Sequence, residues 1–339
     1  GSMAVQMGTM ETVTLSDGTV KEVTTMTLGL NDVYGFVGAG PYWQDSNEDG
    51  RVDESDTPAD ADFGIAIENL DGGFALMRTK VTDSDPGIYL GAKLTFDKAG
   101  LVGAVEDEVE LEVNDFTLEV NLGLDSSLAT IDFKASFGVQ GYAVDTGNEA
   151  EPVYLDYEDM YFRVAGQAFL NVMDLVYFNG FLDVRLSSDE LMIFLDASAS
   201  IGDKPESRGG DPVLEFEALG LFVVNSGGIG LSLELSGGVD FAGVLEIEAE
   251  FNLYLNTSGE EYVYTVPEEF RYDAQDNPDG LEYNEVTITA GAPQIDGSEG
   301  DPGFYLVVSG GESMTLVDAF EFEGDFFFEI CYEYFKIMF

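Results

Sequence analysis

Apolar and polar residues alternate through most of the chain with a period of two. One clear run covers residues 109–122, where its apolar members are Val109, Leu111, Val113, Phe116, Leu118, Val120 and Leu122. A period of two places every second side chain on the same face of an extended strand, so such runs predict half-buried antiparallel strands. The sequence contains no long amphipathic stretch with helix caps, and the pattern therefore predicts an all-β protein.

Short segments rich in Gly, Asp, Asn and Pro separate the predicted strands. The first hairpin is predicted around Asp17-Gly18, a dipeptide that favours the tight turn between two antiparallel strands. Further strands are predicted at residues 28–37, 63–68, 74–80, 88–96, 109–122, 131–144, 161–169, 175–186, 191–200, 214–224, 229–235, 245–255, 262–266, 286–290, 304–308, 315–322 and 326–335. The expected architecture is a mostly antiparallel, Gly-rich meander that forms an extended sandwich, a barrel or a solenoid.

A weak internal duplication suggests two related units. The stretch Y-F-R-V-A-G from Tyr161 aligns with Y-L-V-V-S-G from Tyr305, and Gly166 aligns with Gly310. The predicted division is residues 1–30 as a tag remnant (Gly1-Ser2-Met3) with a hairpin, residues 31–186 as a first β unit and residues 187–339 as a second. The alternative is that any Gly-rich meander resembles itself.

The stretch from Asp45 to Asp56 reads D-S-N-E-D-G-R-V-D-E-S-D and matches the calcium-loop pattern D-x-[DN]-x-[DN]-G. Gly50 supplies the sharp bend at position six. Asp56 at position twelve is one methylene shorter than the usual Glu, and in this it resembles calcium loops of the dockerin type. The alternative is an acidic surface turn. The predicted Ca²⁺ ligands are Asp45, Asn47, Asp49, the backbone carbonyl of Arg51, Asp53 and Asp56.

Charge narrows the expected partners. The 339 residues include 13 Lys and Arg against 66 Asp and Glu, which gives a net charge of −53, and there is no His. Such a surface repels nucleic acid and anionic lipid and attracts divalent cations. Two explanations of this negative charge are adaptation to a saline environment and neutralisation of the carboxylates by bound calcium. Both favour a location outside the cytosol, so an extracellular or cell-surface protein is expected. No apolar run reaches the length of a membrane helix, and no membrane insertion is expected.

The composition also excludes several kinds of catalytic and metal site. Without His there can be no Ser-His or Cys-His nucleophile and no imidazole zinc ligand. The single Cys331 cannot form an internal disulfide, and no phosphate-binding Gly motif is present. Pairs of carboxylates, which a glycosidase needs, carry little information among 66 acids. We therefore predict no catalytic or organic-cofactor residues and a protein that is not an enzyme, with a glycan-active enzyme as the remaining catalytic alternative.

Stretches such as F-G-I-A-I-E-N-L-D-G-G-F-A-L-M and G-V-D-F-A-G-V-L-E-I-E-A-E-F-N-L resemble repeats of giant, acidic, Gly-rich bacterial surface and secreted proteins. The resemblance implies a structural or adhesive segment, rigidified by calcium. Its partners would be neighbouring repeats of the same parent chain, a second copy through self-association at the apolar C-terminal strands, or cell-surface glycans. A calcium-dependent saccharide-binding module is the alternative function.

Overall fold

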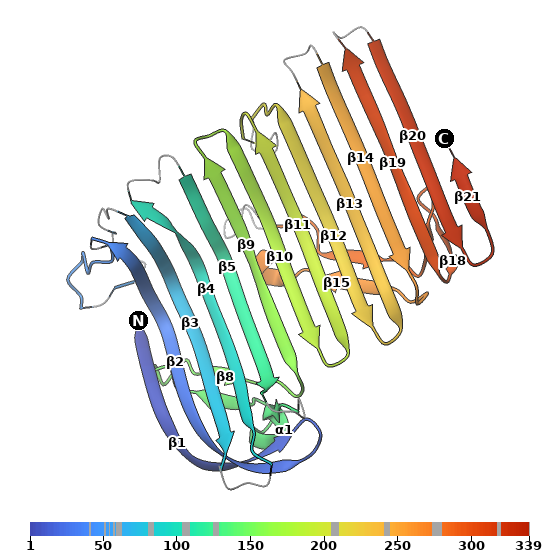
Figure 1. The fold of residues 1–339 in the computed structure, drawn as a ribbon. Coiled ribbons are helices and arrows are strands. Elements are labelled where there is room, and N and C mark those ends of the chain that lie inside the picture. The colour runs from blue at the N-terminus through green and yellow to red at the C-terminus, as the bar shows by residue number, and fades with distance from the viewer. Residues whose placement is uncertain are drawn as a thin grey trace. The chain divides into compact units, whose positions relative to one another are not determined.

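The computed structural model describes residues 1–40, 42–50, 52–53, 55–56, 58, 63–80, 85–103, 109–124, 129–204, 210–240, 245–272, 280–316 and 320–338. Within these ranges the regular structure is almost entirely β. The exceptions are the short helix α1 (Phe133–Phe137) and a 3₁₀ turn, η2 (Glu268–Phe270). Fifteen strands belong to a large antiparallel sheet. The prediction of an all-β, mostly antiparallel meander is confirmed (Figure 1).

Two compact units make up the chain. Unit 1 comprises Gly1–Gln167 and Val184–Ser188, and unit 2 comprises Ala168–Asp183 and Asp189–Phe339. The division falls within two strands, β9 (Tyr161–Val172) and β10 (Val176–Ser187).

Unit 1 contains five long strands and the two-residue β6 in the hydrogen-bonded order β5-β4-β3-β2-β1-β6. The predicted hairpin around Asp17-Gly18 is confirmed, because β1 and β2 pair in antiparallel register across it. Two very short strands, β7 and β8, pair separately. The bounds are β1 (Ser2–Leu15), β2 (Val20–Ala39), β3 (Phe63–Thr79), β4 (Ile88–Gly103), β5 (Val109–Gly123), β6 (Ile131–Asp132), β7 (Tyr142–Val144) and β8 (Val153–Leu155).

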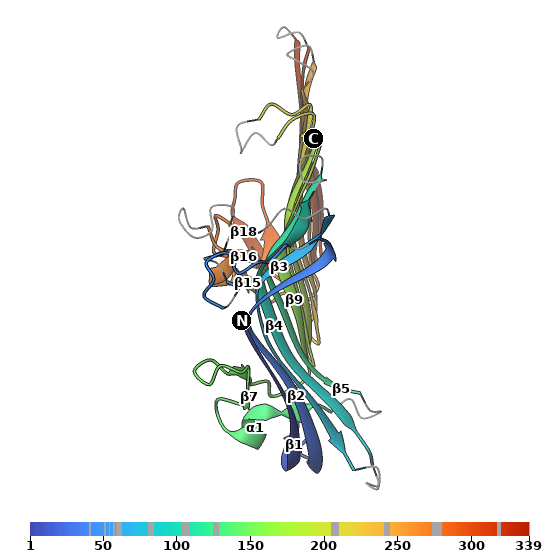
Figure 2. The same cartoon turned by 90° about the vertical axis from the view of Figure 1, so that its left-hand side faces the viewer.

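The core of unit 1 lies on one face of these strands, beneath α1, β7 and β8, and Figure 2 shows α1 and β7 on one side of the strands. Phe133 is fully buried at its centre, 6.2 Å from the ring of Phe137 and 6.5 Å from that of Tyr142. The prediction of a strand over residues 131–144 is wrong at this point. Asp132 accepts a hydrogen bond from the backbone N–H of Ala135 at 2.8 Å and so starts α1, which a propensity for extended structure does not reveal.

The sequence segments 63–68 and 74–80 were predicted as two strands parted by an Asp-Gly-Gly turn, but they form the single strand β3. Gly72 and Gly73 pair with Leu94 and Lys93 of β4 without interruption. A Cβ at position 73 would lie 3.0 Å from the Val153 side chain. The glycine is therefore explained by the close approach of β8 to the sheet and not by a turn.

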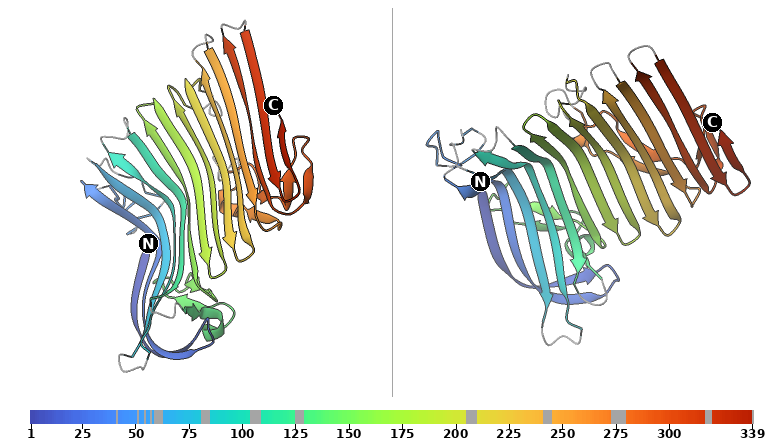
Figure 3. Two further views of the ribbon diagram at one scale, coloured as in Figure 1. Left: turned by 45° about the vertical axis from the view of Figure 1, so that its right-hand side comes forward. Right: turned by 45° about the horizontal axis from the view of Figure 1, so that its top comes forward.

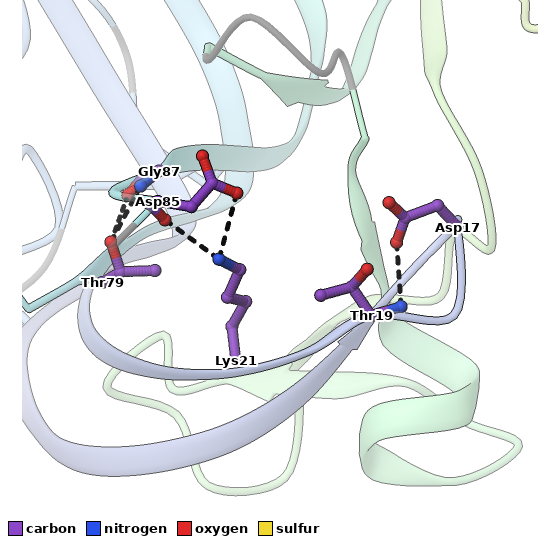
Figure 4. Close-up of polar contacts among 6 residues, drawn as sticks. All are labelled: Asp17, Thr19, Lys21, Thr79, Asp85 and Gly87. Carbon is purple, nitrogen blue, oxygen red and sulfur yellow. Dashed lines mark hydrogen bonds and ion pairs between the residues drawn. The ribbon is translucent and has the colours of Figure 1, made fainter. Parts of the chain in front are cut away.

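Polar side chains close the turns at one end of the unit 1 strands (Figure 4). Thr19 N–H donates to Asp17 Oδ1 at 2.8 Å within the first hairpin. Lys21 Nζ donates to the Asp85 backbone oxygen at 2.9 Å and lies 3.2 Å from its Oδ2. These contacts join the β1–β2 turn to the connection between β3 and β4.

Unit 2 contains long strands in the order β21-β20-β19-β14-β13-β12-β11 (Figure 3). The Gly310-Gly311 pair lies inside β19, so the strand predicted at residues 304–308 continues to Leu316. The prediction of a single strand over residues 315–322 is wrong, because Thr315 and Leu316 end β19 whereas Phe320 begins β20. Short strands pair as β15–β16 and β17–β18. The bounds are β11 (Glu190–Ile201), β12 (Leu214–Asn225), β13 (Gly228–Asp240), β14 (Leu245–Asn256), β15 (Tyr262–Thr265), β16 (Glu285–Ile288), β17 (Gly291–Pro293), β18 (Glu299–Pro302), β19 (Tyr305–Leu316), β20 (Phe320–Cys331) and β21 (Phe335–Met338).

The core of unit 2 also lies on one face of its long strands, here beneath β15 to β18. Phe194 of β11 is fully buried and stacks on Tyr264 of β15, with ring centroids 4.2 Å apart and planes within 7°. Ala292 of β17 packs in one cluster with Val307 and Phe327. No helix in the described ranges is long and apolar enough to cross a membrane.

Candidate calcium loop

The predicted calcium loop lies in unit 1, in the connection from β2 to β3. Its first end is held by Trp43, whose indole Nε1 donates to the backbone oxygen of Gly35 in β2 at 2.7 Å. The Trp43 ring lies edge-on to Tyr34 at 5.0 Å and to Tyr42 at 4.8 Å. Because an aromatic cluster and a hydrogen bond both fix Trp43, the chain enters the loop from a defined position two residues before Asp45.

Asp45 organises the bend of the loop. Its Oδ1 accepts a hydrogen bond from Asp49 N–H at 3.0 Å, and its Oδ2 accepts one from Gly50 N–H at 2.8 Å. Asn47 Oδ1 accepts from the same Asp49 N–H at 2.9 Å. Gly50 has a φ of +92°, a backbone conformation that residues with a Cβ rarely adopt. The side-chain oxygens at loop positions one and three therefore converge on one amide.

Asp56, at position twelve, folds back onto the start of the loop. Its Oδ1 accepts from Ser46 N–H at 2.7 Å, from Ser46 Oγ at 3.1 Å and from Asn47 N–H at 3.3 Å. Its Oδ2 accepts from Asp53 N–H at 3.1 Å. Burial alone would raise the pKa of the Asp56 carboxyl, but the N–H donors of Asp53, Ser46 and Asn47 lower this pKa below its usual value.

The Asp53 side chain does not bond to the backbone segment that Asp45, Asn47 and Asp56 share. Its Oδ1 accepts from Ser55 Oγ at 2.6 Å and from Ser55 N–H at 2.9 Å, and these two hydrogen bonds lower the pKa of the Asp53 carboxyl. Ser55 Oγ also accepts from Asn47 Nδ2 at 2.8 Å. Arg51, predicted to contribute its carbonyl, lies outside the described residues.

The donor chemistry of the loop fits calcium, which takes six to eight oxygen ligands from carboxylates, amides and carbonyls. Within the described residues, however, no group of three or more Asp, Glu or Cys side chains is placed to hold a metal ion. The carboxylates of Asp45 and Asp56 instead accept hydrogen bonds from the loop's own backbone. A carboxylate offers about four lone-pair sites, so the two hydrogen bonds that Asp45 accepts leave acceptor capacity on both oxygens.

A polar cavity of about 830 Å³ adjoins the loop in unit 1 and was not anticipated from the sequence. Asp71 Oδ1 lies in it and accepts from Asp32 N–H at 2.8 Å, while Asn69 Nδ2 donates to Asp97 Oδ2 at 2.9 Å. Asp32 and Asn69 have φ values of 52° and 50°, which mark irregular points in β2 and β3. The sequence feature that could have indicated this cavity is the Asn31-Asp32 pair, which interrupts the apolar stretch of β2. The lining residues are Asn31, Asp32, Tyr34, Asp53, Ser55, Asn69, Asp71, Asp97, Asn148, Glu151, Pro152 and Val153.

A second polar contact with shifted pKa values lies in unit 2, where the Tyr283 hydroxyl donates to Asp196 Oδ2. Burial raises the pKa of the Asp196 carboxyl, although the hydrogen bond from Tyr283 opposes this. Burial and the carboxylate also raise the pKa of Tyr283. This hydrogen bond attaches the segment after residue 280 to β11, so the shifted pKa values of Tyr283 and Asp196 are explained by a structural contact.

Comparison with known proteins adds no relative: a scan of protein-family models finds no match to the chain, and a search of curated proteins finds none either.

Proposed function

We propose that this chain is a non-enzymatic structural or adhesive segment of a large bacterial cell-surface or secreted protein, and that Ca²⁺ bound between Asp45 and Asp56 rigidifies it. The observation that carries the proposal is the return of Asp56 onto the turn organised by Asp45. This return brings loop positions one, three and twelve to the same short backbone segment. A calcium loop requires that closure, whereas an ordinary acidic turn does not.

Calcium would act on the long connection between Ala39 and Phe63. The described residues of this connection form no helix or strand, and connections of such length are generally functional. Trp43 anchors one end of the connection on β2, and an ion held by Asp45, Asn47 and Asp56 would hold its middle. The acidic surface, with its net charge of −53, supports a location where divalent cations are abundant.

A calcium-dependent saccharide-binding module is the second candidate. It is favoured by the rings of Tyr34, Tyr42 and Trp43 next to the loop, because aromatic rings and a bound cation are common means of binding sugars. Calcium-dependent retention of the protein on immobilised glycans, lost in Trp43→Ala, would support this function over a purely structural one.

Terbium luminescence tests the calcium site directly. Trp43 lies two residues before Asp45, so its indole is within about 1 nm of an ion in the loop, since a residue spans at most about 3.6 Å. Excitation of Trp43 should sensitise terbium bound in the loop, and added calcium should compete the emission away. Asp49→Ala should remove most of the signal, because it deletes the predicted ligand at position five.

The matched control is Asp17→Ala, which removes an aspartate that also caps a turn in unit 1 but lies outside the loop. This variant should retain the full signal, and Trp43→Phe should lose it. If the Asp49→Ala protein keeps all of its calcium-competable emission, the loop is an acidic turn and the proposal fails.

A further inference from the structure

The long strands of unit 2 have a second face, which none of the described elements of this unit covers. Strands β15 to β18 lie against one face only, as Figure 2 shows for β15, β16 and β18. On that face Phe194, Leu221 and Val307 are at most 1% exposed. On the opposite face the exposed fractions are 46% for Phe216 and 38% for Phe251.

The register makes this uncovered face continuously apolar. Pairing across β11, β12, β13, β14, β19 and β20 aligns one residue from each strand in a row. One row consists of Ile193, Phe222, Leu231, Leu255, Leu306 and Ile330. The next two rows, which begin at Leu195 and Ala197, likewise contain only aliphatic residues, Phe and Gly. We call these three rows, with the adjoining row that begins at Ala199, the apolar face.

Carboxylates are segregated to the other side of the same strands. Glu217, Glu250 and Asp325 belong to one row of that side, aligned through Ser236 and Gly311. Within the four rows of the apolar face the only charged residue is Glu312, in the outermost row. A protein with a net charge of −53 thus keeps one broad surface almost free of charge.

We propose that the apolar face of unit 2 is the interface with a second copy of this chain, packed face to face. Four rows of six residues, spaced about 4.8 Å between strands and about 6.7 Å along them, cover about 770 Å² per copy. A pair would bury about 1,500 Å², which lies within the range of about 1,200–2,000 Å² found in stable specific interfaces.

Face-to-face packing also satisfies the electrostatics. Two sheets pack with their planes about 10 Å apart, so the carboxylates of the opposite rows would point away from the interface in both copies. At physiological ionic strength the Debye length is about 8 Å, so repulsion between the two acidic surfaces would be largely screened. A bilayer is the poorer occupant, because the unpaired backbone groups at a sheet edge cannot be satisfied in hydrocarbon. The self-association is independent of the proposed calcium loop, which lies in unit 1.

Analytical ultracentrifugation of the full chain tests the proposal. The wild-type protein should sediment as a dimer at micromolar concentration, with an affinity that rises with salt because the acidic surfaces are screened. Phe251→Glu places a charge in the middle of the apolar face and should weaken association at least about 100-fold. Its control is Asn252→Glu, the neighbouring residue on the acidic side, which adds the same charge and should leave the dimer intact.

Circular dichroism must show that Phe251→Glu is folded. If it is not, Phe251→Ala replaces it and should weaken association about tenfold, as expected for an aromatic residue at the centre of an interface. A wild-type protein that is monomeric at about 100 μM in 0.5 M salt would overturn the proposal. So would an unchanged dimer in the folded Phe251 variant. Flotation of the wild-type protein with phosphatidylcholine vesicles would overturn it in favour of a membrane surface.

Discussion

Two adjacent phenylalanines of β20 provide a direct test of which face of unit 2 is covered. Phe327 is 4% exposed and packs in a cluster with Ala292 and Val307, whereas Phe326 points to the opposite side and is 39% exposed. The substitutions Phe327→Ala and Phe326→Ala remove the same atoms from neighbouring positions in the same strand. They therefore differ chiefly in what covers the ring.

The expected magnitudes follow from burial. Truncation of a buried Phe to Ala costs about 3–5 kcal/mol, because a cavity is added to the lost transfer free energy. Phe327 also has Lys336 Nζ at 5.0 Å from its ring centroid, a contact that contributes about 0.5–1 kcal/mol at an exposed site. Phe326 opens onto solvent, so its truncation leaves no closed cavity and should cost about 1–2 kcal/mol of transfer free energy.

Urea unfolding followed by circular dichroism at low protein concentration measures the difference. With a slope of about 3 kcal/mol per molar urea, Phe327→Ala should lower the midpoint by about 1–2 M and Phe326→Ala by roughly 0.5 M. The slope itself should not change. Equal shifts, or a larger shift for Phe326→Ala in the monomer, would show that the covered face has been assigned wrongly.

Three further outcomes are expected. Millimolar calcium should raise the melting temperature more than magnesium does at equal ionic strength, since a ligand at one hundred times its Kd stabilises the folded state by about 2.7 kcal/mol; equal shifts would indicate general screening. The Asp56 carboxyl should titrate below its usual value in NMR without calcium, so its contribution to stability is complete above the unfolded-state pKa and is lost as pH falls through the lower folded-state pKa; an ordinary pKa would contradict the folded-back position of Asp56. Asp196→Asn should raise the unfolding midpoint more as pH rises, because burial raises the pKa of the Asp196 carboxyl and its charged form therefore costs stability above the folded-state pKa. A loss of stability that grows with pH would mean that the charged form is required.

Alternation along the chain was sufficient to predict the class of fold, because it records which side of each strand is apolar. The alternation did not predict where one strand continues through a glycine pair. Gly72 and Gly310 look like turn residues in sequence but lie inside β3 and β19, since their role is set by what approaches the strand in three dimensions. The proposed duplication that aligns Tyr161 with Tyr305 stays a prediction, although both residues begin twelve-residue strands.

The loop pattern was sufficient to identify the candidate ligands but not their orientation. Asp45 and Asn47 converge because both side chains accept from Asp49 N–H, an arrangement that the spacing implies. Asp53 instead accepts a hydrogen bond from Ser55. The spacing of the loop residues does not show whether the Asp53 carboxylate binds a neighbouring hydroxyl or an ion. The predicted calcium site stays a prediction until an ion is measured in it.

The connectivity of unit 2 sets an order of events during folding. Strands β11, β12 and β13 each pair with the next strand along the chain, and β12 and β13 are joined by a two-residue turn between Asn225 and Gly228. The partner of β14 is β19, so Asn256 must find Tyr305 across the whole segment that contains β15 to β18. Closing that segment costs about 3 kcal/mol more chain entropy than closing the short turn. The hairpins therefore form first, and β19 and β20 join an already assembled edge. A chain that emerges from its N-terminus would expose the edge of β14 to other unpaired strands until Leu316, the last residue of β19, has arrived.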